Sequence, residues 1–202
     1  MDFKKRLFSK LLVRSGDRVD KILNDKKVSL FSGIGGKTLE IGAGIGVNAR
    51  YFSDKSNLIA LEPNHYFQSY LVNKYSKVII SSAEKIDLPN NSIDNVISSL
   101  VLCSVSNESK VISEIYRILK PGGKYYLIEH IPSDKYWLKI FQRFFSPIYQ
   151  FFGDGCHPER DIVKEVNKSS FNILKLEKFK ADLKDSLIKD FVSGILQKPE
   201  TI

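Results

Sequence analysis

A glycine-rich turn at residues 42–46 constrains the fold of this chain more than any other feature. The apolar segment 38–41 (TLEI) runs directly into a turn that carries Gly42, Gly44 and Gly46. Glycine adopts backbone conformations closed to other residues and lets the main chain pass close to a ligand. At the carboxyl end of a parallel strand, such a turn forms part of a ligand-binding crevice. The sequence therefore predicts an α/β fold with a small-molecule site at this edge.

Strand and helix patterns alternate along most of the chain. Short apolar segments separated by amphipathic ones indicate a parallel sheet covered on both faces. Segment 108–119 has apolar residues at helical spacing and is stopped by the Pro-Gly-Gly of 121–123. We expect a doubly wound α/β fold: a mostly parallel seven-stranded sheet, helices on both faces and an antiparallel C-terminal strand. The expected strands are 37–41, 58–62, 77–81, 95–99 and 124–129, closed by 171–179 and 187–196; further helices are expected at 47–53, after Asn64, and at 158–168.

The composition indicates an ordinary globular protein. The chain has 202 residues, of which 43% are hydrophobic and 27% charged. No internal repeat or linker divides it, so we expect a single domain over 1–202. Within it, 1–31 is expected to be an amphipathic helical segment, and 131–170 a helical insertion on the acceptor side. No segment reaches the ~20 apolar residues of a membrane-spanning helix, and no secretion signal is evident. We therefore expect a cytoplasmic protein.

The basic charge has two interpretations. The net charge is +8, from 31 Lys and Arg against 23 Asp and Glu. The surplus is mostly lysine spread along the chain, without an arginine cluster or a basic-aromatic stripe, so we expect no nucleic-acid partner. The basic segment 1–31 either lies over the ligand site or sheet, or rests peripherally on an anionic membrane.

The two cysteines do not suggest a metal centre. Cys103 and Cys156 are the only cysteines and form no CxxC pair. We therefore expect neither a zinc cluster nor, in a reducing compartment, a disulfide. Cys103 alone is typical of a buried core residue.

A carboxylate follows the second expected strand. Glu62 is placed to accept hydrogen bonds from both ribose hydroxyls of an adenosine. The third glycine of the turn comes one residue earlier than in the nicotinamide fingerprint GxGxxG. The ligand is therefore expected to be an adenosine compound other than a nicotinamide dinucleotide.

Four motifs together resemble the class I S-adenosylmethionine-dependent methyltransferases. They are the glycine turn, Glu62, segment 81–94 and segment 117–123, in order and spacing over roughly residues 37–130. The resemblance implies S-adenosylmethionine as cofactor: the turn and Glu40 would hold its methionine moiety, Glu62 its ribose, and segment 82–84 its adenine edge. The residues so implied are Glu40, Gly42, Ala43, Gly44, Gly46, Glu62, Pro63, Ser82, Ala83, Glu84 and Leu100.

A narrower resemblance lies downstream. Segments 100–105 (LVLCSV), 126–130 (YLIEH) and 154–156 (DGC), with Arg160, are similar to the methyltransferase-like family of thiol S-methyltransferases. This implies a small, lipophilic acceptor, with a thiol favoured. Family members known from animals carry a hydrophobic N-terminal anchor, whereas this chain has a basic amphipathic segment. The alternatives are a quinone or phospholipid-headgroup methyltransferase at a membrane surface, and a non-catalytic cofactor-binding protein.

The candidates for chemistry on the acceptor are Glu129, His130, Cys156 and His157. Glu129 and His130 end the fifth expected strand, where side chains face the ligand crevice. His130 is the better candidate base, although a structural histidine fits as well. His157 precedes a proline and would also fit as a helix cap. A thiol acceptor needs little help from a base, because its pKa is ~8.5 and the thiolate is the nucleophile. The aromatic segment 136–152 is expected to form a lid and to favour an apolar acceptor.

Overall fold

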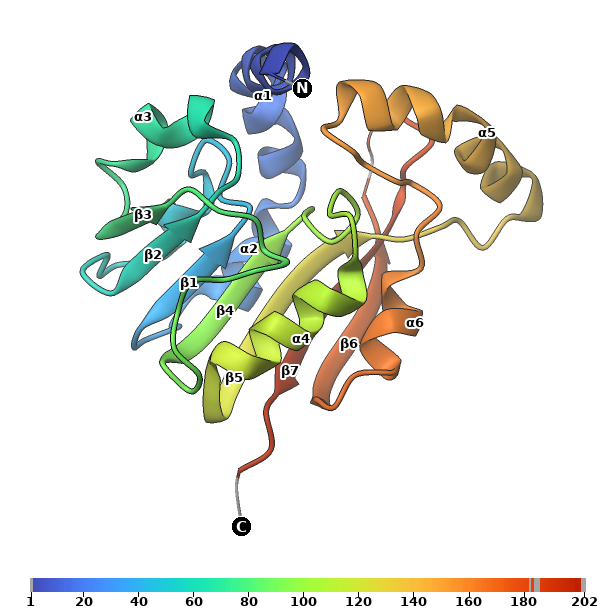
Figure 1. Ribbon diagram of the computed structural model, residues 1–202. Coiled ribbons are helices and arrows are strands. Elements are labelled where there is room, and N and C mark those ends of the chain that lie inside the picture. Colours follow the sequence, from blue (N-terminus) through green and yellow to red (C-terminus); the bar gives the residue numbers. More distant parts are fainter. Residues whose placement is uncertain (1, 182, 184–185, 201–202) are drawn as a thin grey trace.

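The computed structural model describes residues 2–181, 183 and 186–200 (Figure 1). The first and last positions of the expected domain, Met1 and residues 201–202, lie outside this part of the chain.

Seven strands form one sheet in the order β3-β2-β1-β4-β5-β7-β6. Strands β1 to β5 are parallel, while β7 runs antiparallel to both β5 and β6. The expected mostly parallel sheet with an antiparallel C-terminal strand is therefore confirmed. The strands are β1 (Thr38–Ile41), β2 (Leu58–Leu61), β3 (Lys77–Ile79), β4 (Ile93–Ser99), β5 (Leu119–His130), β6 (Asn172–Lys180) and β7 (Asp190–Gln197).

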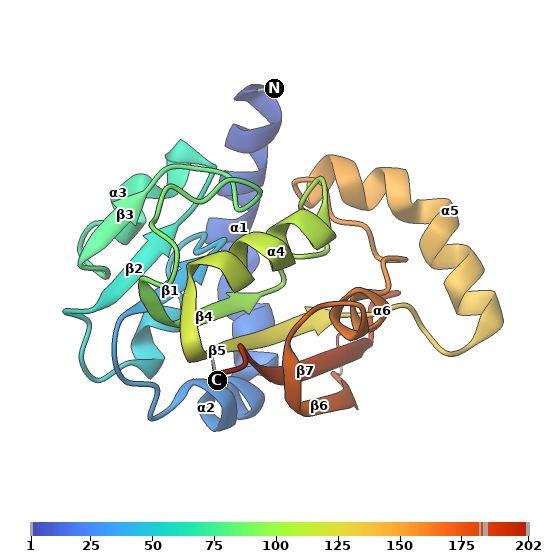
Figure 2. The same ribbon diagram turned by 60° about the horizontal axis from the view of Figure 1, so that its bottom comes forward.

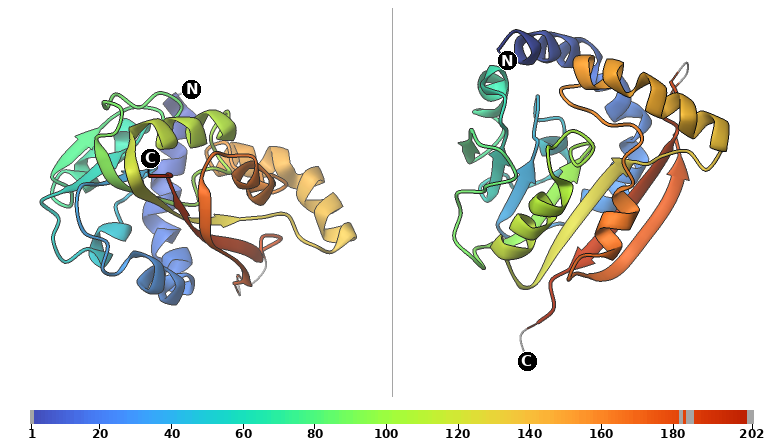
Figure 3. Two further views of the ribbon diagram at one scale, coloured as in Figure 1. Left: turned by 90° about the horizontal axis from the view of Figure 1, so that it is seen from below. Right: turned by 45° about the vertical axis from the view of Figure 1, so that its right-hand side comes forward.

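Helices cover both faces of the sheet, as the two views of Figures 2 and 3 show. On one face, α4 (Glu108–Ile118) and α6 (Ile162–Asn167) contribute Ile115 and Val166 to the larger apolar core. On the other face, Leu23, α2 (Asn24–Phe31) and the short α3 (Gln68–Leu71) form a second core with the opposite side chains of the strands. Successive side chains of a strand point to opposite faces of the sheet. Neighbouring residues of β1 and of β5 therefore face different cores, and this decides where the site residues point.

Two helices lie over the carboxyl edge of the parallel strands, at the top of Figure 1: α1 (Asp2–Ile22) and α5 (Tyr136–Phe152). Lys5 of α1 donates from Nζ to the carbonyl of Pro63 at 2.9 Å, and Asn64 donates from Nδ2 to the carbonyl of Lys5 at 3.0 Å. The Lys4 ammonium lies 4.9 Å from the ring centroid of Phe151 in α5. The N-terminal helix therefore lies over the ligand edge, as the first of its two interpretations predicts.

Several element boundaries differ from the expectation. The helix expected at 47–53 is a short 3₁₀ turn, η1 (Asn48–Tyr51), and the helix after Asn64 begins as η2 (His65–Phe67). The helix expected from residue 158 begins only at Ile162, because the Asp161 side chain caps it by accepting from Lys164 N at 3.1 Å. Strand β5 begins at Leu119 rather than at 124, because Leu119 pairs with Ile93 ahead of a register shift.

In the part of the chain that the structure describes, no helix combines the length and apolarity needed to cross a membrane.

Candidate active site

The glycine turn after β1 is clamped between two neighbouring segments. The Gly42 N–H donates to the carbonyl of Leu61 at 2.8 Å, and all three glycines of the turn have positive φ. A Cβ atom on Gly42 would lie 2.5 Å from Cγ2 of Val101, in the loop after β4. Only glycine fits this approach, so the sequence motif reflects both the backbone conformation and the closeness of the next loop.

Glu62 joins the end of β2 to the glycine turn. Its Oε2 accepts from Gly44 N, and its Oε1 accepts from Asn64 N, each at 2.8 Å. Burial raises the pKa of this carboxyl above its usual value, although the two amide donors act in the opposite direction. The carboxylate therefore lies at the carboxyl edge, next to the turn, where the sequence places it.

Glu40 lies on the face of the sheet covered by α2, beneath the turn. Its carboxylate accepts from the Tyr75 hydroxyl at 2.5 Å and from Asn48 Nδ2 at 2.8 Å, and the residue is 1% exposed. Burial raises its pKa to about 7, against the effect of these two donors and the charge of Lys27. Both carboxylate oxygens of Glu40 thus accept from side chains of the protein itself.

The segment expected along the adenine edge makes contacts of its own. The Ser82 hydroxyl donates to the Glu84 carboxylate, whose other oxygen accepts from Ser106 N at 2.7 Å. Ala83 is buried in the apolar core. Glu84 therefore holds the loop after β4, and both Ser82 and Glu84 are partly exposed.

The loop after β4 is held in a strained conformation by Glu129. Leu100 has a φ of 60°, which is uncommon for a residue other than glycine. One oxygen of the fully buried Glu129 accepts from the N–H groups of Val101 and Leu102, at 2.9 and 3.0 Å. Strain of this kind is found mainly at functional sites. One oxygen of Glu129 thus binds the loop backbone, while the other, Oε2, is buried without a hydrogen-bond partner among the described residues.

His130 points to the opposite face from Glu129 and meets two cysteines. Its Nε2 lies 3.2 Å from Sγ of Cys156. A ligand atom from each of Cys103, His130 and Cys156 lies within 4.8 Å of the other two. Contact with Cys156 and burial raise the pKa of Cys103 well above its usual value. Sequence reasoning missed this group, because the residues lie on three separate segments and only the fold brings them together.

Residues 153–160 dock onto the loop after β4. Arg160 donates from Nη1 to the carbonyls of Leu102 and Val105, at 2.9 and 2.6 Å. A Cβ on Gly155 would lie 2.9 Å from the Ser104 carbonyl oxygen, so glycine permits the close contact. His157 takes part through its backbone N–H, which donates to the Cys103 carbonyl at 2.9 Å. Its ring lies beside Gln150 and Glu159, outside the group of Cys103, His130 and Cys156.

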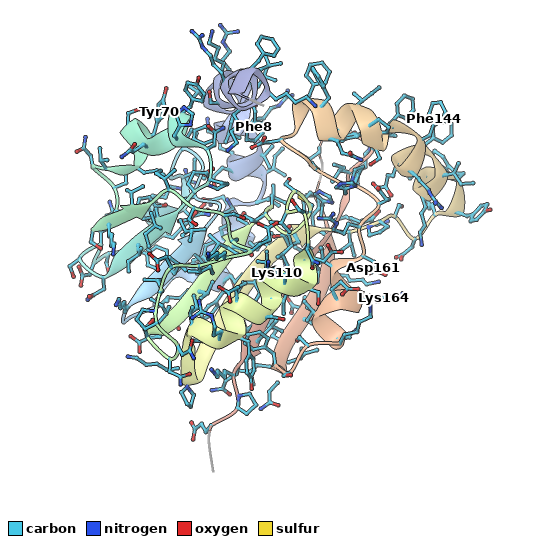
Figure 4. All side chains as sticks on the ribbon, viewed as in Figure 1. Phe8, Tyr70, Lys110, Phe144, Asp161 and Lys164 are labelled. Carbon is cyan, nitrogen blue, oxygen red and sulfur yellow. The ribbon has the colours of Figure 1, made fainter. Side chains whose placement is uncertain are left out.

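The aromatic segment is a helix, but most of its rings do not face the site. Gln142 and Ser146 are the buried residues of α5, and Gln142 donates to the Leu187 carbonyl and accepts from Ser133 N. Phe144 is 76% exposed and projects away from the sheet (Figure 4). The expectation of an aromatic lid over the acceptor is therefore wrong for the exposed rings, because the polar side of α5 packs inward. The exposed aromatic side chains of α5 are Tyr136, Trp137, Phe141, Phe144, Phe151 and Phe152.

Comparisons with known proteins identify the family and the fold of this chain. Residues 39–127 match the family described as a methyltransferase domain. The chain is 29% identical to thiol S-methyltransferase TMT1A of Homo sapiens, covering 96% of this chain and 87% of that protein. It is 32% identical to thiol S-methyltransferase TMT1B of Rattus norvegicus, covering 86% and 78%. Among solved structures, an S-adenosylmethionine-dependent methyltransferase from Thermotoga maritima shares the fold with a TM-score of 0.70 at 17% identity, covering 96% of this chain and 99% of that one.

The sheet order, the glycine turn and the matched domain define an S-adenosylmethionine-dependent methyltransferase that acts on a small-molecule acceptor. Within that class, the chain belongs to the family of thiol S-methyltransferases.

Proposed function

We propose that this enzyme transfers the methyl group of S-adenosylmethionine to the sulfur of a small, lipophilic thiol. The observation that carries the proposal is the docking of residues 153–160 on the loop after β4. Arg160 joins the two segments that distinguish the thiol S-methyltransferase resemblance, and Val101 of that loop touches the glycine turn. Residues 153–160 and the loop after β4, which we relate to the acceptor, therefore lie beside the glycine turn, which we relate to the cofactor.

The cofactor is proposed to lie across the carboxyl ends of β1, β2 and β4. Its ribose hydroxyls would donate to Glu62, beside Pro63, and its adenine would lie along Ser82, Ala83 and Glu84. Its methionine portion would lie between the backbone of Gly42, Ala43, Gly44 and Gly46 and the strained Leu100. Glu40 is proposed to act through Tyr75 and Asn48 rather than to touch the cofactor, because it is 1% exposed on the face of the sheet covered by α2, away from the carboxyl edge.

Methyl transfer from a sulfonium is an in-line displacement. A bond forms between the acceptor sulfur and the methyl carbon while the bond from that carbon to the cofactor sulfur breaks, leaving S-adenosylhomocysteine. The protein mainly has to hold the three atoms in line and exclude water. We propose that His130 and Cys156 face the acceptor, that Glu129 positions the loop beside it, and that His157 contributes through its backbone.

An acceptor panel read out by S-adenosylhomocysteine release tests this function. Alkyl and aryl thiols are expected to support turnover, whereas matched quinols, phospholipid headgroups and amines are not. Intact S-adenosylmethionine binding without turnover on any thiol would remove the thiol assignment. Turnover on a quinol or headgroup instead would identify the acceptor as one of those classes.

We further propose peripheral contact with an anionic membrane through α1, with α5 extending the same surface. Basic side chains lie on both helices, including Lys10 and Arg14 on α1 and Lys139 and Arg143 on α5, beside the exposed rings of α5. Basic residues next to exposed aromatic side chains are typical of helices that lie in a membrane interface. No nucleic-acid partner is proposed.

Trp137 reports on this contact directly, because it is the only tryptophan and is 56% exposed on α5. Anionic vesicles are expected to shift its fluorescence to shorter wavelength, and zwitterionic vesicles are not. Deletion of residues 1–15 is expected to weaken binding. An unchanged spectrum and no co-sedimentation with either vesicle would exclude membrane contact.

A further inference from the structure

Three side chains with metal-binding chemistry converge at the acceptor side of the site. Cys103 comes from the loop after β4, His130 from the end of β5, and Cys156 from the segment after α5. Cys103 and His130 are only 2% and 3% exposed, and Cys156 is partly buried. The group thus lies inside the fold, and Cys156 is the least buried of the three.

The spacing of the three groups is close to that of a tetrahedral site. Zinc binds thiolate sulfur at about 2.3 Å and imidazole nitrogen at about 2.0 Å, which places neighbouring ligand atoms about 3.5 to 3.8 Å apart. Here His130 Nε2 lies 3.2 Å from Cys156 Sγ, and all three ligand atoms lie within 4.8 Å of one another. Shifts of about an ångström would close the geometry around one ion.

The surroundings hold this group in place. Glu129 fixes the backbone just before Cys103, and Arg160 fixes the carbonyls on both sides of it. His130 Nδ1 is buried and has no hydrogen-bond partner among the described residues. A metal ion on Nε2 would leave Nδ1 unpaired as well, so Nε2, which lies 3.2 Å from Sγ of Cys156, is the nitrogen placed to bind the ion.

We propose that Cys103, His130 and Cys156 bind one zinc ion, and that its fourth coordination position takes the sulfur of the acceptor thiol. Two thiolates and one imidazole with an open fourth position form a known type of catalytic zinc site. The second half of the proposal rests on the proposed thiol methyltransferase function. On binding, the thiol loses its proton to solvent and becomes a metal-bound thiolate. Its sulfur then attacks the methyl carbon, and the electron pair of the broken bond goes to the sulfur of S-adenosylhomocysteine.

Cobalt(II) is the probe for the site, because its bonds to thiolate absorb in the near ultraviolet. The reduced full chain, freed of metal, is expected to bind one cobalt ion with this absorption, which zinc then displaces. With no third cysteine in the chain, the signal reports only Cys103 and Cys156. Each Cys→Ser substitution is expected to lower the absorption by roughly half, and His130→Asn to weaken affinity at least ~10-fold. His65→Asn is the matched control and is expected to leave the absorption unchanged.

Circular dichroism of each variant shows whether a lost signal reflects a lost metal site or a lost fold. Of the variants, Cys156→Ser should disturb packing least, because Cys156 is the least buried of the three residues. Absence of thiolate-to-cobalt absorption in the reduced, folded wild-type chain would overturn the proposal. So would absorption that stays at the wild-type level in both cysteine variants.

Addition of a thiol to the cobalt-loaded protein tests whether the acceptor sulfur binds at the fourth coordination position. Adding an alkyl thiol is expected to raise the absorption by roughly half, as a third thiolate binds, whereas the matched alcohol leaves it unchanged. Cobalt binding without any response to thiols would leave the metal site and overturn its acceptor role. Thiol methylation without cobalt or zinc binding would overturn the metal site while the proposed function stands. Cobalt binding without thiol methylation would overturn the proposed function while the metal site stands.

Discussion

The buried carboxyl of Glu40 should make the stability of this enzyme depend on pH in an unusual direction. Burial raises its pKa to about 7 in the folded state, against 4.5 for an ordinary glutamate. Below pH 4.5 the carboxyl is protonated in both states and carries no penalty. As pH rises through 4.5 to 7, the unfolded chain loses this proton more readily, so the folded state loses stability. Above pH 7 the loss is complete, at about 3 kcal/mol.

Glu40→Gln removes this titration while keeping the shape of the side chain. The amide oxygen can accept from Asn48 Nδ2, and the amide nitrogen can donate to the Tyr75 hydroxyl oxygen. Between pH 5 and pH 8, we expect the free energy of unfolding of the variant to rise relative to wild type by about 2.5 kcal/mol. Urea unfolding of both proteins, followed by circular dichroism across this range, measures the difference.

Asp134→Asn is the matched control, since that side chain is 83% exposed. It removes an acid at the surface and should show no rise of this sign. A difference between Glu40→Gln and wild type that stays constant from pH 5 to pH 8 would refute the reasoning. It would mean that Glu40 ionises normally in the folded chain, with Lys27 compensating its burial.

Three further substitutions test other parts of the site. Glu62→Gln should weaken S-adenosylmethionine binding by about 1.5–3 kcal/mol, because a charged hydrogen-bond acceptor for the ribose is lost; calorimetry showing wild-type affinity would contradict the ribose assignment. Gly42→Ala should destabilise the fold by at least ~1–3 kcal/mol, since its Cβ would lie 2.5 Å from Val101 at a positive φ; a melting temperature equal to that of wild type would argue against the clamped turn. Arg160→Ala should lower kcat/KM for thiols at least ~10-fold, since two carbonyls of the loop after β4 lose their donor, while cofactor affinity changes little; equal losses in both would indicate general disorder of the site instead.

The sheet was predictable because its signals are local. Apolar strands at 38–41 and 58–61, the positive-φ glycines between them and the Pro-Gly-Gly stop at 121–123 each act within a few residues. The start of β5 was missed because its first pairing, of Leu119 with Ile93, depends on a neighbouring strand.

The site was only partly predictable, because side-chain direction depends on tertiary contacts. Glu40 was expected to help hold the cofactor, and alternation along β1 directs its side chain to Tyr75, a partner 35 positions away that the sequence does not indicate. The rings of α5 were expected over the acceptor, but Gln142 finds two backbone partners inside and turns the polar side inward. The convergence of Cys103, His130 and Cys156 joins residues up to 53 positions apart in sequence, and no spacing motif records it.

Transfer of a labelled methyl group tests the central claim most directly. The purified, reduced enzyme is incubated with S-adenosylmethionine carrying a trideuterated methyl group and an equimolar mixture of a lipophilic thiol, a quinol and an amine. Mass spectrometry of the products should show the label on the thiol sulfur, in an amount equal to the S-adenosylhomocysteine released. Label on the quinol or the amine with none on the thiol would contradict the account.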